Sequence, residues 1–195
     1  MTDFPLYFQL GWEHILDWQG YDHILFVSAL CGIYTWRDWR SVLVLVTAFT
    51  IGHSITLALS VLNFLKISSD WIEFLIPVTI VITCLTNILQ KRKSANSMRV
   101  PYSMAMLFGF IHGLGFSNYL KSLLGRNSNI VAELFSFNLG LEGGQLIIVL
   151  VILFLSFIFT QILKAPQREW NLFLSSAIFG VAFMMALERL ANLLN

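Results

Sequence analysis

The sequence predicts an all-α fold: a polytopic membrane helix bundle of about six transmembrane helices, preceded by an N-terminal amphipathic segment. Of the 195 residues, 57% are hydrophobic and only 12% are charged, whereas a soluble domain usually has about 25% charged residues. The apolar residues are grouped in stretches, most of them near the roughly 20 residues that a helix needs to cross a bilayer. Six such helices with short connections would use most of the chain, so we expect a single integral membrane domain over residues 1–195.

The same composition excludes several other classes of protein. Two cysteines are too few for a secreted domain held together by disulfides, and the high apolar content is the opposite of what disordered chains contain. Cys31 and Cys84 both fall inside apolar stretches, where we expect them to pack as small apolar side chains. The formal net charge of +1 gives no reason to expect a nucleic acid as partner.

The predicted elements begin with residues 4–18, which are amphipathic and should lie at the outer surface of the membrane or fold back into the bundle. Six apolar stretches follow, and we interpret each as a span. They cover residues 21–34, 42–62, 71–89, 104–124, 130–162 and 170–191. The first is short for a span, and the amphipathic segment before it would extend it.

The fifth stretch is too long for one straight helix. Gly140, Gly143 and Gly144 fall within it, so we expect a bend there, or a short helix that leads into the span. Three further glycines flank the histidine of the fourth stretch: Gly109, Gly113 and Gly115. They permit either close packing of helices or a break that opens backbone carbonyls.

The distribution of Lys and Arg between the connections predicts the topology. The connections after the first, third and fifth spans contain Arg37, Arg40, Lys91, Arg92, Lys93, Arg99, Lys164 and Arg168. Those after the second and fourth spans contain only Lys66, Lys121 and Arg126. Because cytoplasmic connections carry the excess of positive charge, the odd-numbered connections should be cytoplasmic and both termini should face outward.

All four histidines of the chain lie in or beside the predicted spans: His14, His23, His53 and His112. Polar side chains are costly in hydrocarbon and usually mark a pathway or a site. Counting along each span places His53 and His112 near the middle of the membrane, with Glu142 at a comparable depth. His14, Asp22 and His23 should lie near the outer end of the first span. We therefore expect these six side chains to meet in the outer half of the bundle.

This combination of side chains favours a site for a divalent transition metal. Imidazole nitrogens bind zinc, nickel, cobalt and copper, and carboxylates lower the cost of holding a divalent ion in a low dielectric. Asp22 could bind the ion directly or orient the imidazole of His23. The alternative is that each histidine only bonds the backbone of a neighbouring helix. That alternative is weak when four histidines accompany Asp22 and Glu142.

Other polar side chains support a shared site. Three hydroxyls at helical spacing flank His53: Thr47, Thr50 and Ser54. Such hydroxyls also bond back to their own helix, which is the structural alternative. In the fifth span, three polar residues form one helical stripe that should face the interior: Asn138, Glu142 and Gln145. Near the end of the sixth span, we expect Glu188 and Arg189 to form a solvated pair.

Four blocks of the sequence follow one another in a distinctive order: GWEHILDWQGYDHILF (11–26), TAFTIGHSITLALS (47–60), FGFIHGLGFS (108–117) and FNLGLEGGQ (137–145). They resemble the HupE/UreJ family of bacterial membrane proteins, above all the branch with the AFT-x-x-HS and HG-x-GF signatures. The resemblance implies a multi-pass protein of the bacterial inner (cytoplasmic) membrane that is associated with nickel or cobalt uptake. The functional residues that it implies are His14, Asp22, His23, His53, His112 and Glu142.

The leading hypothesis is a permease for Ni²⁺ or Co²⁺ with an intramembrane histidine and carboxylate site open to the outer face. The outer residues would capture the ion and the deeper ones pass it on: His14, Asp22 and His23, then His53, His112 and Glu142. The expected partners are the lipid bilayer and the metal ion, while a homo-oligomer or an accessory protein stays open.

The alternative hypothesis is a zinc-dependent intramembrane hydrolase that acts on a lipid, a lipoprotein or a membrane peptide. Histidines, a carboxylate and a water can form an open catalytic zinc site, with Asp22 or Glu142 as general base. A continuous polar path to the cytoplasmic side would favour the permease. A closed metal site that opens to a lipid-facing groove would favour the hydrolase.

Overall fold

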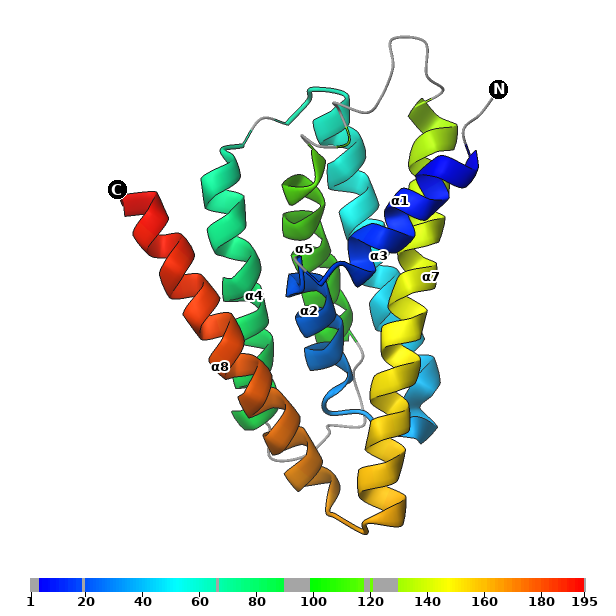
Figure 1. Cartoon of the computed structure of the whole chain (residues 1–195), viewed down its shortest axis with the longest axis vertical. Helices are drawn as coiled ribbons and strands as arrows, with labels where there is room; N and C mark the ends of the chain where they lie inside the picture. The colour runs from blue at the N-terminus through cyan, green and yellow to red at the C-terminus, as the bar shows by residue number, and fades with distance from the viewer. Residues whose placement is uncertain are drawn as a thin grey trace.

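The structure, a computed structural model, describes residues 4–18, 20–65, 67–89, 99–117, 120 and 130–194. Within them the chain forms seven α-helices (Figure 1), which confirms the all-α prediction. The helices are α1 (Phe4–Leu16), α2 (Asp22–Cys31), α3 (Trp39–Val61), α4 (Ser69–Leu89), α5 (Arg99–Gly115), α7 (Ile130–Phe157) and α8 (Gln167–Leu194). A short 3₁₀-helix, η1 (Trp36–Asp38), precedes α3, and a π-helical turn, η2 (Ile158–Ile162), continues α7.

Four helical segments of the described residues are long and apolar enough to cross a membrane: Trp36–Val61, Ser69–Leu89, Ile130–Ile162 and Gln167–Leu194. The prediction of a multi-pass membrane protein is thereby confirmed. The other two predicted spans coincide with shorter helices, because α2 has 10 residues and α5 has 17. Of the predicted span 104–124, residues 118–119 and 121–124 lie outside the described residues.

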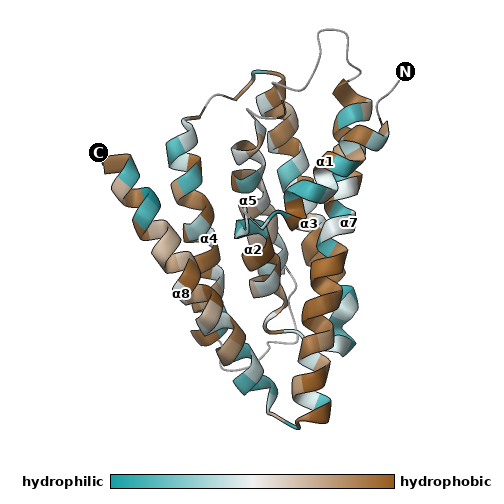
Figure 2. Ribbon diagram, in the orientation of Figure 1, coloured by the Kyte–Doolittle hydropathy of each residue, from teal (hydrophilic) through white to brown (hydrophobic). Residues whose placement is uncertain are grey.

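The distribution of hydrophobic residues along the helices agrees with their assignment as candidate membrane spans. Figure 2 shows that the middle parts of α7 and α8 are hydrophobic, whereas hydrophilic residues gather at helix ends and where α1 meets α2. Because α1 begins and α8 ends at the same end of the bundle (Figure 1), the chain crosses it an even number of times. Several basic residues that predict the orientation lie outside the described residues: Lys66, Lys91, Arg92, Lys93, Lys121 and Arg126.

The N-terminal amphipathic segment folds back into the bundle and packs against α7. A Cβ atom at Gly11 would overlap the carbonyl oxygen of Phe137, and one at Gly140 would overlap that of Phe8. Glycine therefore lets the backbones of α1 and α7 touch. Since α7 is an unbroken α-helix of 28 residues, the expected separate short helix at Gly140, Gly143 and Gly144 does not occur. These glycines serve the contact with α1 instead.

The pair formed by α3 and α5 is equally close, which settles the role of two glycines beside His112. A Cβ atom at Gly109 would overlap the carbonyl oxygen of Phe49, and one at Gly113 would overlap that of His53. α5 continues through both glycines and ends at Gly115. Close packing, rather than a break in the helix, explains them, and it brings α5 directly against the turn of α3 that carries His53.

Two separate helices, α1 and α2, form the N-terminal part of the bundle. Figure 1 shows α1 entering from the end where the chain starts, and α2 continuing from the interior toward the opposite end. α1 ends at Leu16 and α2 begins at Asp22, so a break separates the two helices. His14 and His23 stand on either side of this break, which places two of the four histidines at its edges.

Candidate metal centre

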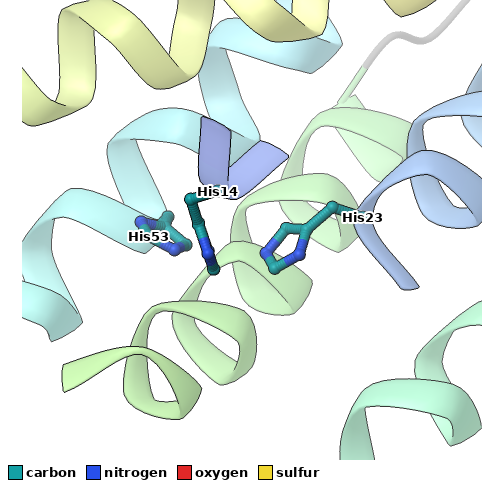
Figure 3. A group of neighbouring side chains, drawn as sticks. All are labelled: His14, His23 and His53. Carbon is teal, nitrogen blue, oxygen red and sulfur yellow. The ribbon is translucent and has the colours of Figure 1, made fainter. Parts of the chain in front are cut away.

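Three histidines from three helices come together at the break between α1 and α2. Ligand nitrogens of His14, His23 and His53 all lie within 4.8 Å of one another. Figure 3 shows the three imidazoles gathered in one place, each from a different helix. The ring centroid of His14 lies 4.6 Å from that of His23 and 6.1 Å from that of His53. This spacing suits a shared metal ion after small movements of the side chains.

His112 of α5 is the neighbour of this group. Its ring centroid lies 5.2 Å from that of His23. The Nδ1 atom of His112 lies 2.9 Å from the carbonyl oxygen of Phe108 on its own helix. Because a carbonyl can only accept a hydrogen bond, Nδ1 carries the proton and Nε2 keeps its lone pair. His112 can therefore bind a metal through Nε2 alone.

Asp22 fixes His23 in the same way. Its Oδ1 accepts hydrogen bonds from the backbone N–H of His23 at 2.8 Å and from the ring Nδ1 at 2.9 Å. The proton thus stays on Nδ1, and the lone pair of Nε2 is available to a metal. A carboxylate behind a ligand histidine orients the ring and raises its basicity. Of the two roles that the sequence left open for Asp22, this geometry fits the orienting one.

All four histidines contain buried nitrogens that no described group bonds. The unpartnered atoms are Nε2 of His14, His23 and His112, and both ring nitrogens of His53. Burying a polar atom without a hydrogen bond costs about 1–3 kcal/mol by protein mutational data, so several such atoms in one place need an explanation. Backbone bonding, the alternative interpretation of these histidines, is seen for Nδ1 of His112. A bound cation would give the unpartnered nitrogens a partner.

Glu142 is not part of the histidine group. Its carboxylate accepts a hydrogen bond from the Thr47 hydroxyl at 2.9 Å. Thr47 lies six residues before His53 on α3, about 9 Å along the helix axis. Thr47 is exposed and Glu142 is partly exposed. The structure thus brings the four histidines and Asp22 together but places Glu142 apart from them, at a contact between α3 and α7.

Of the four supporting polar residues, two form a contact between helices and two bond the backbone of their own helix. The Thr50 hydroxyl donates to Oε1 of Gln145 at 2.8 Å, and Nε2 of this buried glutamine has no partner among the described residues. Ser54 bonds the carbonyl of Thr50 at 2.6 Å, and Asn138 bonds that of Leu134 at 2.8 Å. Thr50 and Gln145 therefore form a cross-helix contact one turn from His53, whereas Ser54 and Asn138 bond their own helices.

An acidic cleft of about 900 Å³ opens onto the histidines. His14, His23 and His112 line it, while His53 is fully buried behind them. The cleft is also lined by four carboxylates: Glu13, Asp17, Asp22 and Glu73. Sequence reasoning missed three of these. Glu13 and Asp17 are spaced four residues apart beside His14, which was an available signal, whereas Glu73 lies at a helix end and carried none.

The carboxylate of Glu73 also has a partner that the sequence did not indicate. Nη1 of Arg189 lies 2.7 Å from Oε2 of Glu73, so the expected solvated pair of Glu188 and Arg189 is wrong. Helices α4 and α8 pack against each other, and this contact brings the end of α8 to the start of α4. A charged residue therefore finds its partner across the helix pair rather than beside it in the chain.

On the side away from the cleft, the histidines rest on a layer of three buried phenylalanines: Phe26, Phe49 and Phe108. Ring centroids of Phe26 and Phe49 lie 5.0 and 5.2 Å from that of His112. These three phenylalanines belong to one apolar cluster, which also contains the free, buried Cys84, and a second apolar cluster contains the free, buried Cys31. The cleft is therefore the opening onto the histidines that the described residues show.

The fold and the site define a class of protein: a multi-pass membrane protein with buried histidines at the floor of an acidic cleft. The chain belongs to the HupE/UreJ family, because the family model described as HupE / UreJ protein matches residues 1–189. The family resemblance of the four sequence blocks is thus confirmed, and with it the link to nickel and cobalt uptake. No curated protein and no solved structure matches the chain.

Proposed function

We propose that this protein is a permease for Ni²⁺ or Co²⁺ that binds the ion between His14, His23 and His53, with His112 as a further ligand. One observation carries this proposal: buried ring nitrogens without partners meet, from four helices, at the break between α1 and α2. Broken helices in the interior of the bundle are typical of the binding sites of secondary transporters. Family membership supports nickel and cobalt as the transported ions.

The chemistry of the ligands suits passage rather than permanent storage. Neutral imidazoles bind Ni²⁺ and Co²⁺ without cancelling their charge. The bound ion therefore keeps an energetic cost of residing in a low-dielectric environment, and this cost favours its release. Asp22 and the other carboxylates of the cleft offset part of this cost. A site of neutral ligands beside acidic residues can therefore bind an ion from dilute solution and still release it.

Beyond the histidines, we propose that the ion follows polar side chains between α3 and α7. Thr50 and Gln145 meet one turn from His53, and Thr47 and Glu142 meet one turn further. Glu142 would then be a relay carboxylate rather than a member of the capture site. Because the phenylalanine layer closes the bundle below the histidines, release requires a second conformation, as alternating access does.

We further propose six crossings, with α1 and α2 together forming one broken span and α5 forming another. Two short helices in series have enough residues to cross the hydrocarbon, since 13 and 10 residues give about 35 Å of helix. The positive-inside rule then places the cleft, and both termini, on the outer face. On this topology, metal enters the site from outside the cell membrane.

The test is metal flux into proteoliposomes. Wild-type protein should show saturable Ni²⁺ or Co²⁺ uptake, which His23→Ala should reduce at least tenfold. Thr83→Ala is the matched control, because the Thr83 hydroxyl is buried but bonds only the carbonyl of Thr79 in the described structure, far from the histidines. No flux above that of empty liposomes, with metal bound in full stoichiometry, would contradict the permease.

A zinc-dependent hydrolase is the second candidate, because three histidines and a cleft open on one side are also what a catalytic zinc requires. The two residues expected from the sequence as general base differ in their distance from the histidines. Glu142 bonds Thr47 away from the histidines, while Asp22 lies beside His23. Bound zinc without flux, together with turnover of a lipid or membrane peptide that Asp22→Asn abolishes, would favour this candidate.

A further inference from the structure

The ion pair between Glu73 and Arg189 stands at the wall of the metal cleft. Glu73 lies near the start of α4 and lines the cleft together with His14, His23 and His112. Its Oε2 lies 2.7 Å from Nη1 of Arg189, and the two side chains are 45% and 44% exposed. Exposed ion pairs of this kind are weak. The carboxylate can therefore exchange its arginine for another cation.

The other charged residues of the cleft are all acidic. Glu13, Asp17 and Asp22 line it together with Glu73, and no lysine or arginine of the described residues does. Clefts lined by one sign of charge concentrate ions of the opposite sign. Glu13 also accepts a hydrogen bond from Gln9 at 2.7 Å, which leaves its charge in place. Water-exposed carboxylates of this kind attract any cation, so they do not define a site alone.

The histidines give the cleft its selectivity. His23 and His112 are 4% and 1% exposed, both line the cleft, and Nε2 of each has no hydrogen-bond partner. A cation attracted by the carboxylates therefore meets nitrogen ligands with free lone pairs at the cleft floor. Hard cations gain little from imidazole, whereas Ni²⁺ and Co²⁺ gain much. The carboxylates thus attract divalent transition-metal ions first, and the histidines bind them afterwards.

We propose that Glu73, together with Glu13 and Asp17, forms an outer station that holds a hydrated divalent cation before the histidines bind it, and that Arg189 competes with this cation for Glu73. The proposal rests on the function proposed above, because it assumes that the histidines bind the metal. At the outer station the ion keeps its water shell. A divalent ion displaces the guanidinium more readily than a monovalent one, since its charge is doubled.

Arg189 consequently slows the entry of cations into the cleft and favours divalent over monovalent ions. With the ion pair intact, Glu73 contributes no net charge to the cleft, and cations are attracted by the other carboxylates of the described lining, such as Glu13. When a divalent ion takes the place of Arg189, the guanidinium is released at the end of α8. In water, a unit charge and a hydrated divalent ion about 8 Å apart interact by about 1 kcal/mol, which changes the local concentration of the ion by about fivefold. Removing Arg189 should therefore speed metal capture by about that factor.

The experiment measures the rate at which purified full-length protein binds Co²⁺, followed by the visible absorption of the cobalt–imidazole complex. At low salt, Arg189→Gln should raise the association rate about fivefold and Glu73→Gln should lower it by a similar factor. The double variant should bind more slowly than Arg189→Gln, because without the Glu73 carboxylate the loss of Arg189 exposes no additional negative charge. All differences should vanish at high salt.

Two controls separate the outcomes. Arg168→Gln removes an exposed arginine near the opposite end of α8 and should leave the rate unchanged, whereas Arg189→Lys keeps the charge and should behave as wild type. Equal rates in wild type, Glu73→Gln and Arg189→Gln would overturn the outer station while the histidine site stands. Equal effects of Arg168→Gln and Arg189→Gln would also overturn it. Absence of cobalt–imidazole absorption in wild type would instead refute the metal site itself.

Discussion

Replacing Asp22 with asparagine tests how the metal centre is built. In the structure, Oδ1 of Asp22 accepts hydrogen bonds from the backbone N–H and from the ring Nδ1 of His23. Asparagine retains an oxygen acceptor of the same size but loses the negative charge. The variant therefore keeps the tautomer of His23, while it removes the charge that makes Nε2 more basic.

The expected size of the effect follows from these two hydrogen bonds. Partners behind a metal-binding histidine typically change metal affinity by about 10–100-fold, which corresponds to about 1.4–2.8 kcal/mol. A hydrogen bond to a charged group contributes about 1.5–3 kcal/mol, so the two estimates agree. Because asparagine preserves the acceptor, we expect Asp22→Asn to weaken metal binding by about tenfold, at the lower end of this range.

The assay is a competitive titration of Ni²⁺ or Co²⁺ against a chelator of known affinity, on purified protein. Asp70→Asn is the matched control, because Asp70 is exposed in the first turn of α4 and is not among the residues of the cleft. An unchanged affinity in Asp22→Asn would refute the orienting role. A loss of more than a thousandfold, or a loss of stoichiometry, would show that Asp22 binds the metal directly.

Three further outcomes are expected. His53→Ala should lower metal occupancy at least tenfold, measured by metal analysis of purified protein, because both its ring nitrogens are buried and unpartnered. Gly109→Ala should lower the free energy of unfolding by about 1–3 kcal/mol, since its Cβ would overlap the backbone of α3; Gly180→Ala, with nothing within 4 Å, should not. Glu142→Gln should reduce flux steeply but leave Co²⁺ binding unchanged, and a loss of binding would place Glu142 in the capture site.

The sequence indicated that the histidines approach one another, whereas it did not indicate the direction of the Glu142 side chain. Counting residues along the predicted spans led us to expect that His53 and His112 meet His23, and their ring centroids lie 6.2 and 5.2 Å from that of His23. The same counting put Glu142 at a comparable depth, yet its side chain bonds Thr47 on α3. Rotation of a helix about its axis depends on its neighbours, and those contacts are not encoded in any one span.

The glycines illustrate the same limit. A glycine within an apolar stretch permits both a break and a close contact, and the sequence near Gly109 or Gly140 is compatible with either. Only the partner helix decides, because Phe49 approaches one and Phe8 the other. Likewise Glu73 carried no signal in the sequence, since an acidic residue at the end of a span is ordinary until the cleft beside it is known.

The break between α1 and α2 connects these observations. An uninterrupted helix would keep His14 and His23 nine residues apart, about 13 Å along its axis, which is too far for one ion. The non-helical chain after Leu16 instead brings the two rings to a centroid distance of 4.6 Å. The backbone groups freed by such a break need water or polar partners, and three residues of the break, Asp17, Trp18 and Gly20, line the cleft together with the histidines. The same break that brings His14 and His23 together therefore also opens onto the cleft.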